Sequence, residues 1–275
     1  MGKAVLKAGI IGGLYGIVIQ VFFDIYRLIW PTTNYLGALA LGTGGLVVGI
    51  LYVFGIMQKI EPHGGFGSIL PLVGVTSMVS NTLNDSRKKD KTTVIDAFFK
   101  GAKPSILMLM SGMIVSMVIA RLATNYAVNA AGPDGTQSLP VGPIVAAGDH
   151  INVVLELVFS FLIMFVLSAI GQVLLMVLKP TFSGVMGILF AYYVIGAFLA
   201  CFGLTQAMLA AGAGGTLVSI FGAGEFVFTS VWLSTSLGLV TFTRLVVFTG
   251  LIGSMYMWGA IAAVIRGRLH PEEIS

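Results

Sequence analysis

Long apolar runs separated by short polar connections dominate this chain. A helix needs about 20 apolar residues to cross the hydrocarbon core of a bilayer. Runs of about that length occur at 8–30, 37–57, 104–124, 151–178, 184–208 and 241–265. The pattern predicts an all-α integral membrane protein with six transmembrane helices. The polar connections between them are too short to fold as a soluble domain, so we expect the lipid bilayer to surround most of the chain.

Two further stretches, 64–83 and 212–239, are apolar but rich in Gly, Ser and Thr. Non-helical backbone at membrane depth persists only where protein or water satisfies its N–H and C=O groups. We therefore predict two Gly-rich re-entrant or broken segments that face each other or a wet cavity. The alternative is that these glycines only let helices pack closely, as small residues do in membranes.

The two halves of the chain repeat the same signals in the same order. Gln20-Val21 recurs as Gln172-Val173, and the motif Phe-Gly-x-x-Gln at 54–58 recurs at 202–206, each time just before a Gly-rich stretch. Such self-similarity predicts a duplication. The predicted units are a first repeat at 1–125, an inter-repeat loop at 126–150 and a second repeat at 151–275.

The distribution of positive charge favours re-entrant segments. If both Gly-rich stretches turn back, 12 of the 15 Lys and Arg residues share one face with both termini, and only Arg27, Arg121 and Arg244 lie on the other. If both Gly-rich stretches crossed the membrane fully, six of these Lys and Arg residues would share the face with the termini. The positive-inside rule thus favours the first arrangement, with cytoplasmic termini in a bacterial inner membrane. Each half then crosses three times, which predicts an inverted repeat of the kind found in secondary transporters.

Composition excludes several other classes of protein. Charged residues make up 9% of the chain, against about 25% in soluble domains. The net charge of +4 arises in short loops, so it indicates orientation and not nucleic-acid binding. No His, Cys, Asp and Glu cluster has metal-ligand spacing and no serine lies in a nucleophile motif, so we expect neither an enzyme nor a bound cofactor.

Two motifs resemble the stage V sporulation protein A (SpoVA) membrane proteins, especially their C and E members. The first is Gly-Gly-Leu at 12–14 followed by Gln20. The second matches the family pattern at Gly65, Gly67, Ser68, Pro71 and Gly74. The chain departs from the family at Val75 and Ser77, where the family has Phe and Asn. In the second half Gly215, Thr216 and Gly222 are in register, but Ser219 replaces Pro.

The resemblance implies a subunit of an assembly that moves dipicolinic acid, with calcium, across the inner membrane of a spore. The expected partners are other membrane subunits or further copies of this chain, and the expected solute is small and anionic. A second hypothesis is a non-conducting scaffold that docks partner proteins through its Gly-rich helix faces.

The candidate site residues come from the broken segments and from polar residues within the spans, because such residues are costly to insert in a bilayer. The predicted pathway residues are Gly65, Gly67, Ser68, Pro71, Gly74, Gln20, Gln58, Gln172, Gln206, Gly215, Gly222 and Glu225. One hypothesis is that Glu225 faces a polar cavity, where it either pairs with Arg244 or carries a proton. The alternative is that Glu225 lies at a water interface. His63 and Glu61 are candidates for gating, or else belong to a solvated loop. The four glutamines line the path or join helices, and Asp24 and Arg27 are expected to pair on one helix face.

Overall fold

A computed structural model describes residues 2–31, 35–90, 93–130, 152–237 and 241–273. Within these ranges the helices are α1 (Gly2–Ile29), α2 (Leu36–Val53), α3 (Ile56–Gly64), α4 (Phe66–Ile69), α5 (Gly74–Asp90), α6 (Val94–Ala130), α7 (Val153–Leu178), α8 (Phe182–Ala200), α9 (Leu204–Ala211), α10 (Ala213–Val218), α11 (Ile220–Leu237), α12 (Thr241–Leu269) and the short 3₁₀ helix η1 (Pro271–Glu273). The expected all-α membrane fold is confirmed.

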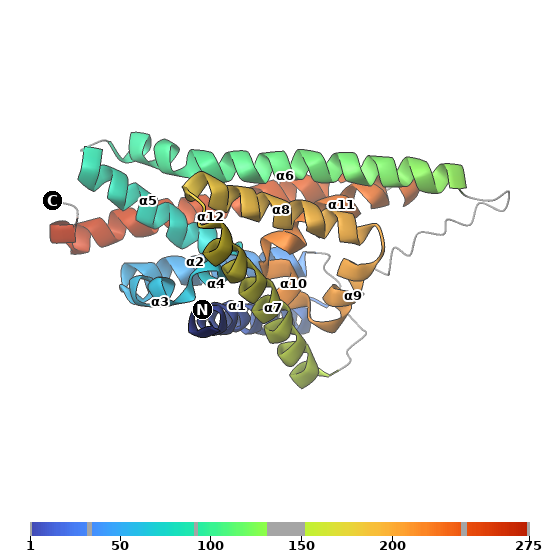
Figure 1. Ribbon diagram of the computed structural model, residues 1–275, viewed down its shortest axis with the longest axis horizontal. Helices are drawn as coiled ribbons and strands as arrows, with labels where there is room; N and C mark the ends of the chain where they lie inside the picture. Colours follow the sequence, from blue (N-terminus) through green and yellow to red (C-terminus); the bar gives the residue numbers. More distant parts are fainter. Residues whose placement is uncertain (1, 32–34, 91–92, 131–151, 238–240, 274–275) are drawn as a thin grey trace.

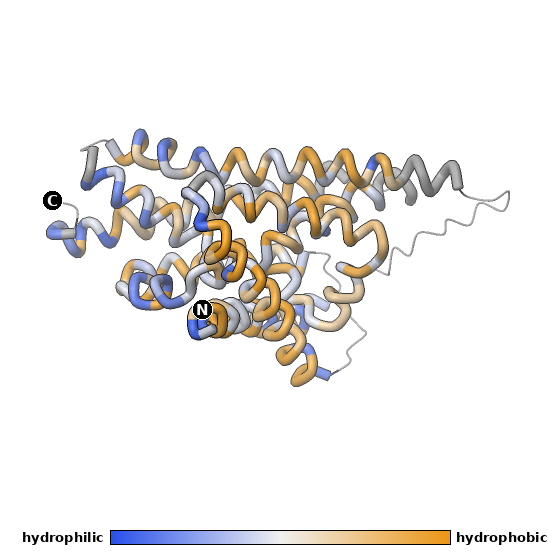
Figure 2. Tube along the Cα trace, viewed as in Figure 1, coloured by the Kyte–Doolittle hydropathy of each residue, from blue (hydrophilic) through white to orange (hydrophobic). Residues whose placement is uncertain are grey.

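Five helices in the described ranges are long and apolar enough to cross a membrane, namely α1, α2, α7 and the segments Val94–Ala123 of α6 and Leu245–Leu269 of α12. The remaining predicted span, 184–208, corresponds to α8, whose apolar part, Gly184–Ala200, is shorter. Apolar residues run along the middle of the long helices, and hydrophilic residues gather toward the end of the molecule that holds the C-terminus (Figure 2). This distribution is that of a multi-pass membrane protein.

Glycine ends the second helix of each half. Gly55 follows α2 with a φ of 75°, and Gly203 follows α8 with a φ of 72°, both in the left-handed region. Glycine takes this conformation without the steric cost that a Cβ imposes. These are the glycines of the repeated Phe-Gly-x-x-Gln motif, so α2 and α8 end a few residues earlier than the apolar runs predict.

The first broken segment is a helical hairpin. After α2 the chain runs into the molecule as α3 and α4. The helix is interrupted at 70–73, and the chain returns as α5 toward the end where α3 began (Figure 1). In the second half α9 and α10 enter, the chain breaks at Ser219, and α11 returns. Neither segment is one continuous helix, which agrees with the prediction of re-entrant or broken segments.

The two breaks meet each other as a short antiparallel bridge between Pro71 and Ser219. The N–H of Leu72 donates to the carbonyl of Val218 at 2.5 Å, and the N–H of Ile220 donates to the carbonyl of Leu70 at 3.2 Å. Backbone groups freed by one break are thus satisfied by the other. The pairing satisfies the requirement that backbone N–H and C=O groups at membrane depth have hydrogen-bond partners.

The helix packing repeats with the halves exchanged. α1 packs along α7, α2 packs against α12 as α8 packs against α6, and α5 packs against α12 as α11 packs against α6. The end of α5, the start of α6 and the end of α12 lie toward the same end of the molecule (Figure 1). The repeat is therefore inverted about the bridged breaks. The repeat boundaries themselves stay a prediction, because most of the loop 126–150 lies outside the described residues.

Candidate functional site

A cavity of about 500 Å³ opens beside the first hairpin. The first half contributes Glu61, Gly65, Ser68, Ile69, Gly74, Val75, Ser77, Met78, Asn81, Thr82, Asp85, Ser105 and Met108, and the second half contributes Met186, Leu189 and Ile220. Its volume is within the range of small-molecule sites, about 300–1,000 Å³. Asp85 is exposed, so the cavity reaches solvent at that end. Ile220 adjoins the bridge, so the other end reaches the point where the breaks meet.

Polar groups form one wall of this cavity. Asn81 of α5 donates from its Nδ2 to Oε2 of Glu61 on α3 at 2.6 Å, which joins the two arms of the hairpin. Ser77, one helical turn before Asn81, donates to the carbonyl of Gly74 at 3.1 Å. Ser77, Asn81 and Asp85 are spaced by four residues, so they share one face of α5. Burial raises the pKa of the Glu61 carboxyl, while the hydrogen bond from Asn81 acts in the lowering direction.

Ser68 provides an unused polar group at the cavity wall. Its side chain is 5% exposed, and its Oγ has no hydrogen-bond partner among the described residues. Its carbonyl also lies outside the helical hydrogen-bond ladder, because the N–H of Leu72 donates across the bridge to Val218. A buried hydroxyl without a partner costs free energy. The Oγ lies against Gly64 and is itself covered, so Ser68 faces the cavity with its other atoms.

The other wall is apolar and flexible. Met78, Met108 and Met186 line it together with Leu189 and Ile220. Methionine side chains adapt their shape to irregular ligands. The cavity is thus two-sided, with oxygen atoms on the α3–α5 face and hydrocarbon on the side of α6, α8 and α11.

Two glutamines hold the broken segments at equivalent positions. Gln20 of α1 accepts through Oε1 from the N–H of Gly214 at 2.7 Å, and Gln172 of α7 accepts through Oε1 from the N–H of Phe66 at 2.9 Å. Gly214 lies five residues before Ser219, and Phe66 lies five residues before Pro71. Each of these N–H groups is at the start of a short helix, where a backbone N–H has no acceptor within the helix. The glutamines therefore anchor the broken segments of the opposite half.

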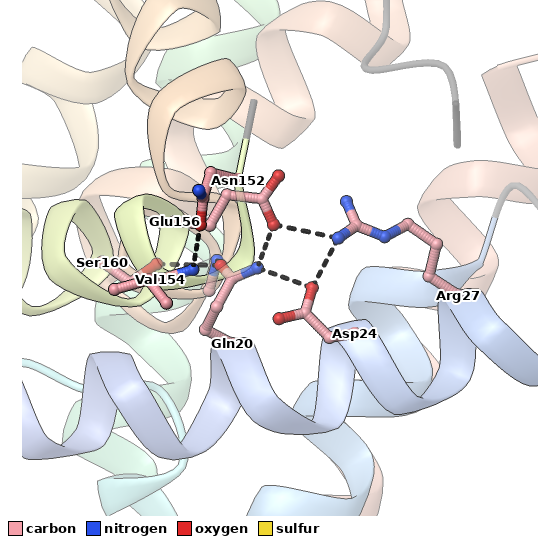
Figure 3. Close-up of polar contacts among 8 residues, drawn as sticks. Gln20, Asp24, Arg27, Asn152, Val154, Glu156 and Ser160 are labelled. Carbon is pink, nitrogen blue, oxygen red and sulfur yellow. Dashed lines mark hydrogen bonds and ion pairs between the residues drawn. The ribbon is translucent and has the colours of Figure 1, made fainter. Parts of the chain in front are cut away.

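A buried charged cluster surrounds Gln20 (Figure 3). Arg27 Nη2 donates to Asp24 Oδ1 at 2.7 Å and to Glu156 Oε2 at 2.9 Å, and Gln20 Nε2 donates to the same two oxygens at 2.9 and 3.3 Å. Ser160 of α7 donates to Gln20 Oε1 at 2.8 Å. The predicted Asp24–Arg27 pair is confirmed. The cluster links α1, the start of α7 and, through Gln20, the tip of the second broken segment.

The cavity brings together only some of the predicted site residues. Gly65, Ser68, Gly74 and Glu61 line it. The others lie elsewhere: Pro71 is in the bridge, Gln20 and Gln172 anchor the breaks, Gln58 donates to the carbonyl of Tyr52, and His63 is exposed. Gly67, Gly215 and Gly222 each pack against a backbone carbonyl, of Ala8, Ser160 and Thr216 respectively. Close packing, the alternative role for glycine, therefore describes these three.

The second-half candidates are less completely described. Glu225 is 3% exposed and accepts a hydrogen bond from the Thr229 hydroxyl at 2.6 Å, and it is not among the residues that line the cavity. The side chains of Gln206 and Arg244 lie outside the described residues, so the Glu225–Arg244 pair stays a prediction.

Sequence reasoning missed Glu156, Ser160, Asn81 and Asp85. Glu156 carried a usable signal, because an acidic residue at the start of an apolar span is rare and costly. Asn81 also carried one, since it lies on the same helix face as Ser77 of the SpoVA-like motif.

Comparison of the chain with protein-family models, curated proteins and solved structures gave no match to any of the three. The resemblance to SpoVA proteins therefore stays a prediction that depends on the two motifs.

Replacing Gln172 with Leu should destabilise the first hairpin, because the N–H of Phe66 loses its acceptor. A buried amide left unsatisfied costs about 1–3 kcal/mol. We expect a lower midpoint of thermal unfolding in detergent. Val173→Leu, at the neighbouring and more exposed position, is the control and should leave the midpoint unchanged. Equal midpoints for both variants would show that Gln172 is not an anchor.

Proposed function

We propose that this multi-pass membrane protein moves a small polar solute across the bilayer, with the cavity beside the first hairpin as its binding site. The observation that carries this proposal is the position of the cavity. Its polar wall, with the Glu61–Asn81 pair, extends from solvent to the bridged breaks of an inverted repeat.

Inverted repeats suit alternating access, because two halves of similar fold can exchange conformations around a fixed midplane site. The bridge between the breaks has only two backbone hydrogen bonds. Separation of the breaks would open the inner end of the cavity toward the opposite face. The glutamine anchors would keep each short helix attached to α1 or α7 during that movement.

The membrane and the orientation belong to the proposal as well. The cluster of Lys and Arg at one face supports cytoplasmic termini in a bacterial inner membrane. By resemblance this is the spore inner membrane, and dipicolinic acid with calcium is the solute to test first.

Thiol labelling tests the proposed pathway. Cys201 is the chain's one cysteine, so a Cys201→Ser background permits single cysteines elsewhere. We expect Met78→Cys and Asn81→Cys to react with a membrane-impermeant maleimide in vesicles, because both positions line the cavity and both are partly exposed. Ser80→Cys is the matched control on the same helix. Ser80 is fully buried and donates to the carbonyl of Gly259 at 2.8 Å, so it should stay protected.

Protection of all three cysteines would contradict the pathway. It would favour the second hypothesis, a non-conducting scaffold with closely packed glycines. Flux of a solute into vesicles that contain the purified chain then measures transport itself.

A further inference from the structure

The chemistry of the cavity wall identifies a class of solute that differs from the expected anion. We infer that the cavity binds a small aliphatic amine in its protonated, cationic form. This inference depends on the proposed function, because it concerns the same cavity.

The first argument is charge. Glu61 and Asp85 are the ionisable groups among the described residues that line the cavity, and Lys, Arg and His are absent from this lining. Glu61 receives a hydrogen bond from the neutral amide of Asn81, which orients the carboxylate without neutralising it. An anion placed here would meet two carboxylates and no compensating charge. A cation would gain charge-assisted hydrogen bonds, which are stronger than neutral ones.

The second argument is the nature of the polar atoms. An ammonium group carries only hydrogen-bond donors, and the wall offers acceptors. These are the Glu61 carboxylate and the carbonyl of Ser68, which the break leaves outside the helical ladder.

The third argument is size and the second wall. A cavity of about 500 Å³ is far larger than a bare alkali ion requires. Groups of three or more His, Cys, Asp or Glu that could hold a metal are also absent from the described residues. The side formed by Met78, Met108, Met186, Leu189 and Ile220 can cover a hydrocarbon body. An organic ammonium ion matches both walls, with its head at Glu61 and its chain against the methionines.

Three probes of nearly equal shape separate charge from size: n-butylammonium, neutral butyramide and anionic butyrate, with N-methylglucamine chloride keeping the ionic strength constant. Two readouts on the full chain in detergent serve each probe. These are the midpoint of thermal unfolding and the rate of maleimide labelling at Met78→Cys. We expect butylammonium to raise the midpoint and slow labelling, and butyramide and butyrate to do neither. Dipicolinate, with and without calcium, is tested in parallel.

The matched variants are Glu61→Gln and Glu272→Gln. Loss of one charge-assisted partner should weaken butylammonium binding about tenfold or more. Glu272, an exposed carboxylate at the C-terminus, should be replaceable without effect. Asp85→Asn provides a second test if Glu61→Gln does not fold, because Asp85 lines the cavity at its solvent end, and we expect weaker binding there too.

Unchanged butylammonium binding in Glu61→Gln, or protection by butyrate or dipicolinate equal to that by butylammonium, would overturn the amine assignment and leave the pathway intact. Failure of the pathway has a different signature, since Met78→Cys and Asn81→Cys would then be unreactive with no ligand present.

Discussion

Replacing Arg27 with Leu is expected to lower the free energy of unfolding by about 3–5 kcal/mol, the cost of breaking a buried ion pair by removing one partner. Arg27 is 6% exposed, and one of its nitrogens binds both Asp24 and Glu156. The variant loses both charge-assisted hydrogen bonds and keeps both carboxylates between α1 and α7. Denaturant titration of the purified protein in micelles measures the loss.

The double variant Arg27→Leu/Glu156→Gln separates charge from packing. If the cost comes from an uncompensated carboxylate, neutralising Glu156 should recover part of the stability lost in Arg27→Leu. Arg268→Leu, at an exposed position in the last turn of α12, is the matched control and should change stability little. A destabilisation by Arg27→Leu no larger than that by Arg268→Leu would mean that the cluster is not essential to the fold.

Local sequence signals predicted most of the fold. The Phe-Gly-x-x-Gln motif marks the left-handed glycines that end α2 and α8, and the Gly-rich runs that follow become the two hairpins. Both features depend on neighbours in the sequence, because glycine takes the left-handed conformation that ends a helix without steric cost. The matching Gln-Val pairs were also informative, since the two glutamines occupy equivalent positions at the breaks.

The composition of the site was harder to predict, because it depends on contacts between distant residues. Glu156 carried the signal of an acid at the start of an apolar span, but that signal does not tell whether the residue lies at the surface or between helices. Only its contact with Arg27 of α1 shows that it is buried. The cavity likewise joins α3, α5, α6 and α8, and no local pattern predicts that Met186 lies near Glu61. The expected anionic solute came from motif resemblance, whereas the wall charges depend on three-dimensional arrangement.

The glycines of the breaks also provide a test of the inverted repeat. A Cβ at Gly67 would overlap the carbonyl of Ala8, and a Cβ at Gly215 would overlap the carbonyl of Ser160. Ala8 lies in α1 and Ser160 in α7, so each broken segment packs backbone to backbone on the first helix of one half. Backbone atoms cannot rotate away as a side chain can, so the helices themselves would have to separate.

Gly67→Ala and Gly215→Ala should therefore each destabilise the protein by about 3 kcal/mol, the upper part of the usual range for overpacking. Gly253→Ala is the matched control, because no neighbouring heavy atom lies within 4 Å of a Cβ placed there. In the middle of α12 that change should be neutral or stabilising by up to about 1 kcal/mol, since alanine favours helix more than glycine does. Denaturant titration compares the three variants. Opposite signs at the breaks and at Gly253 are expected, and equal effects at all three positions would contradict close packing at the breaks. A large loss at Gly67 with none at Gly215 would contradict the equivalence of the two halves.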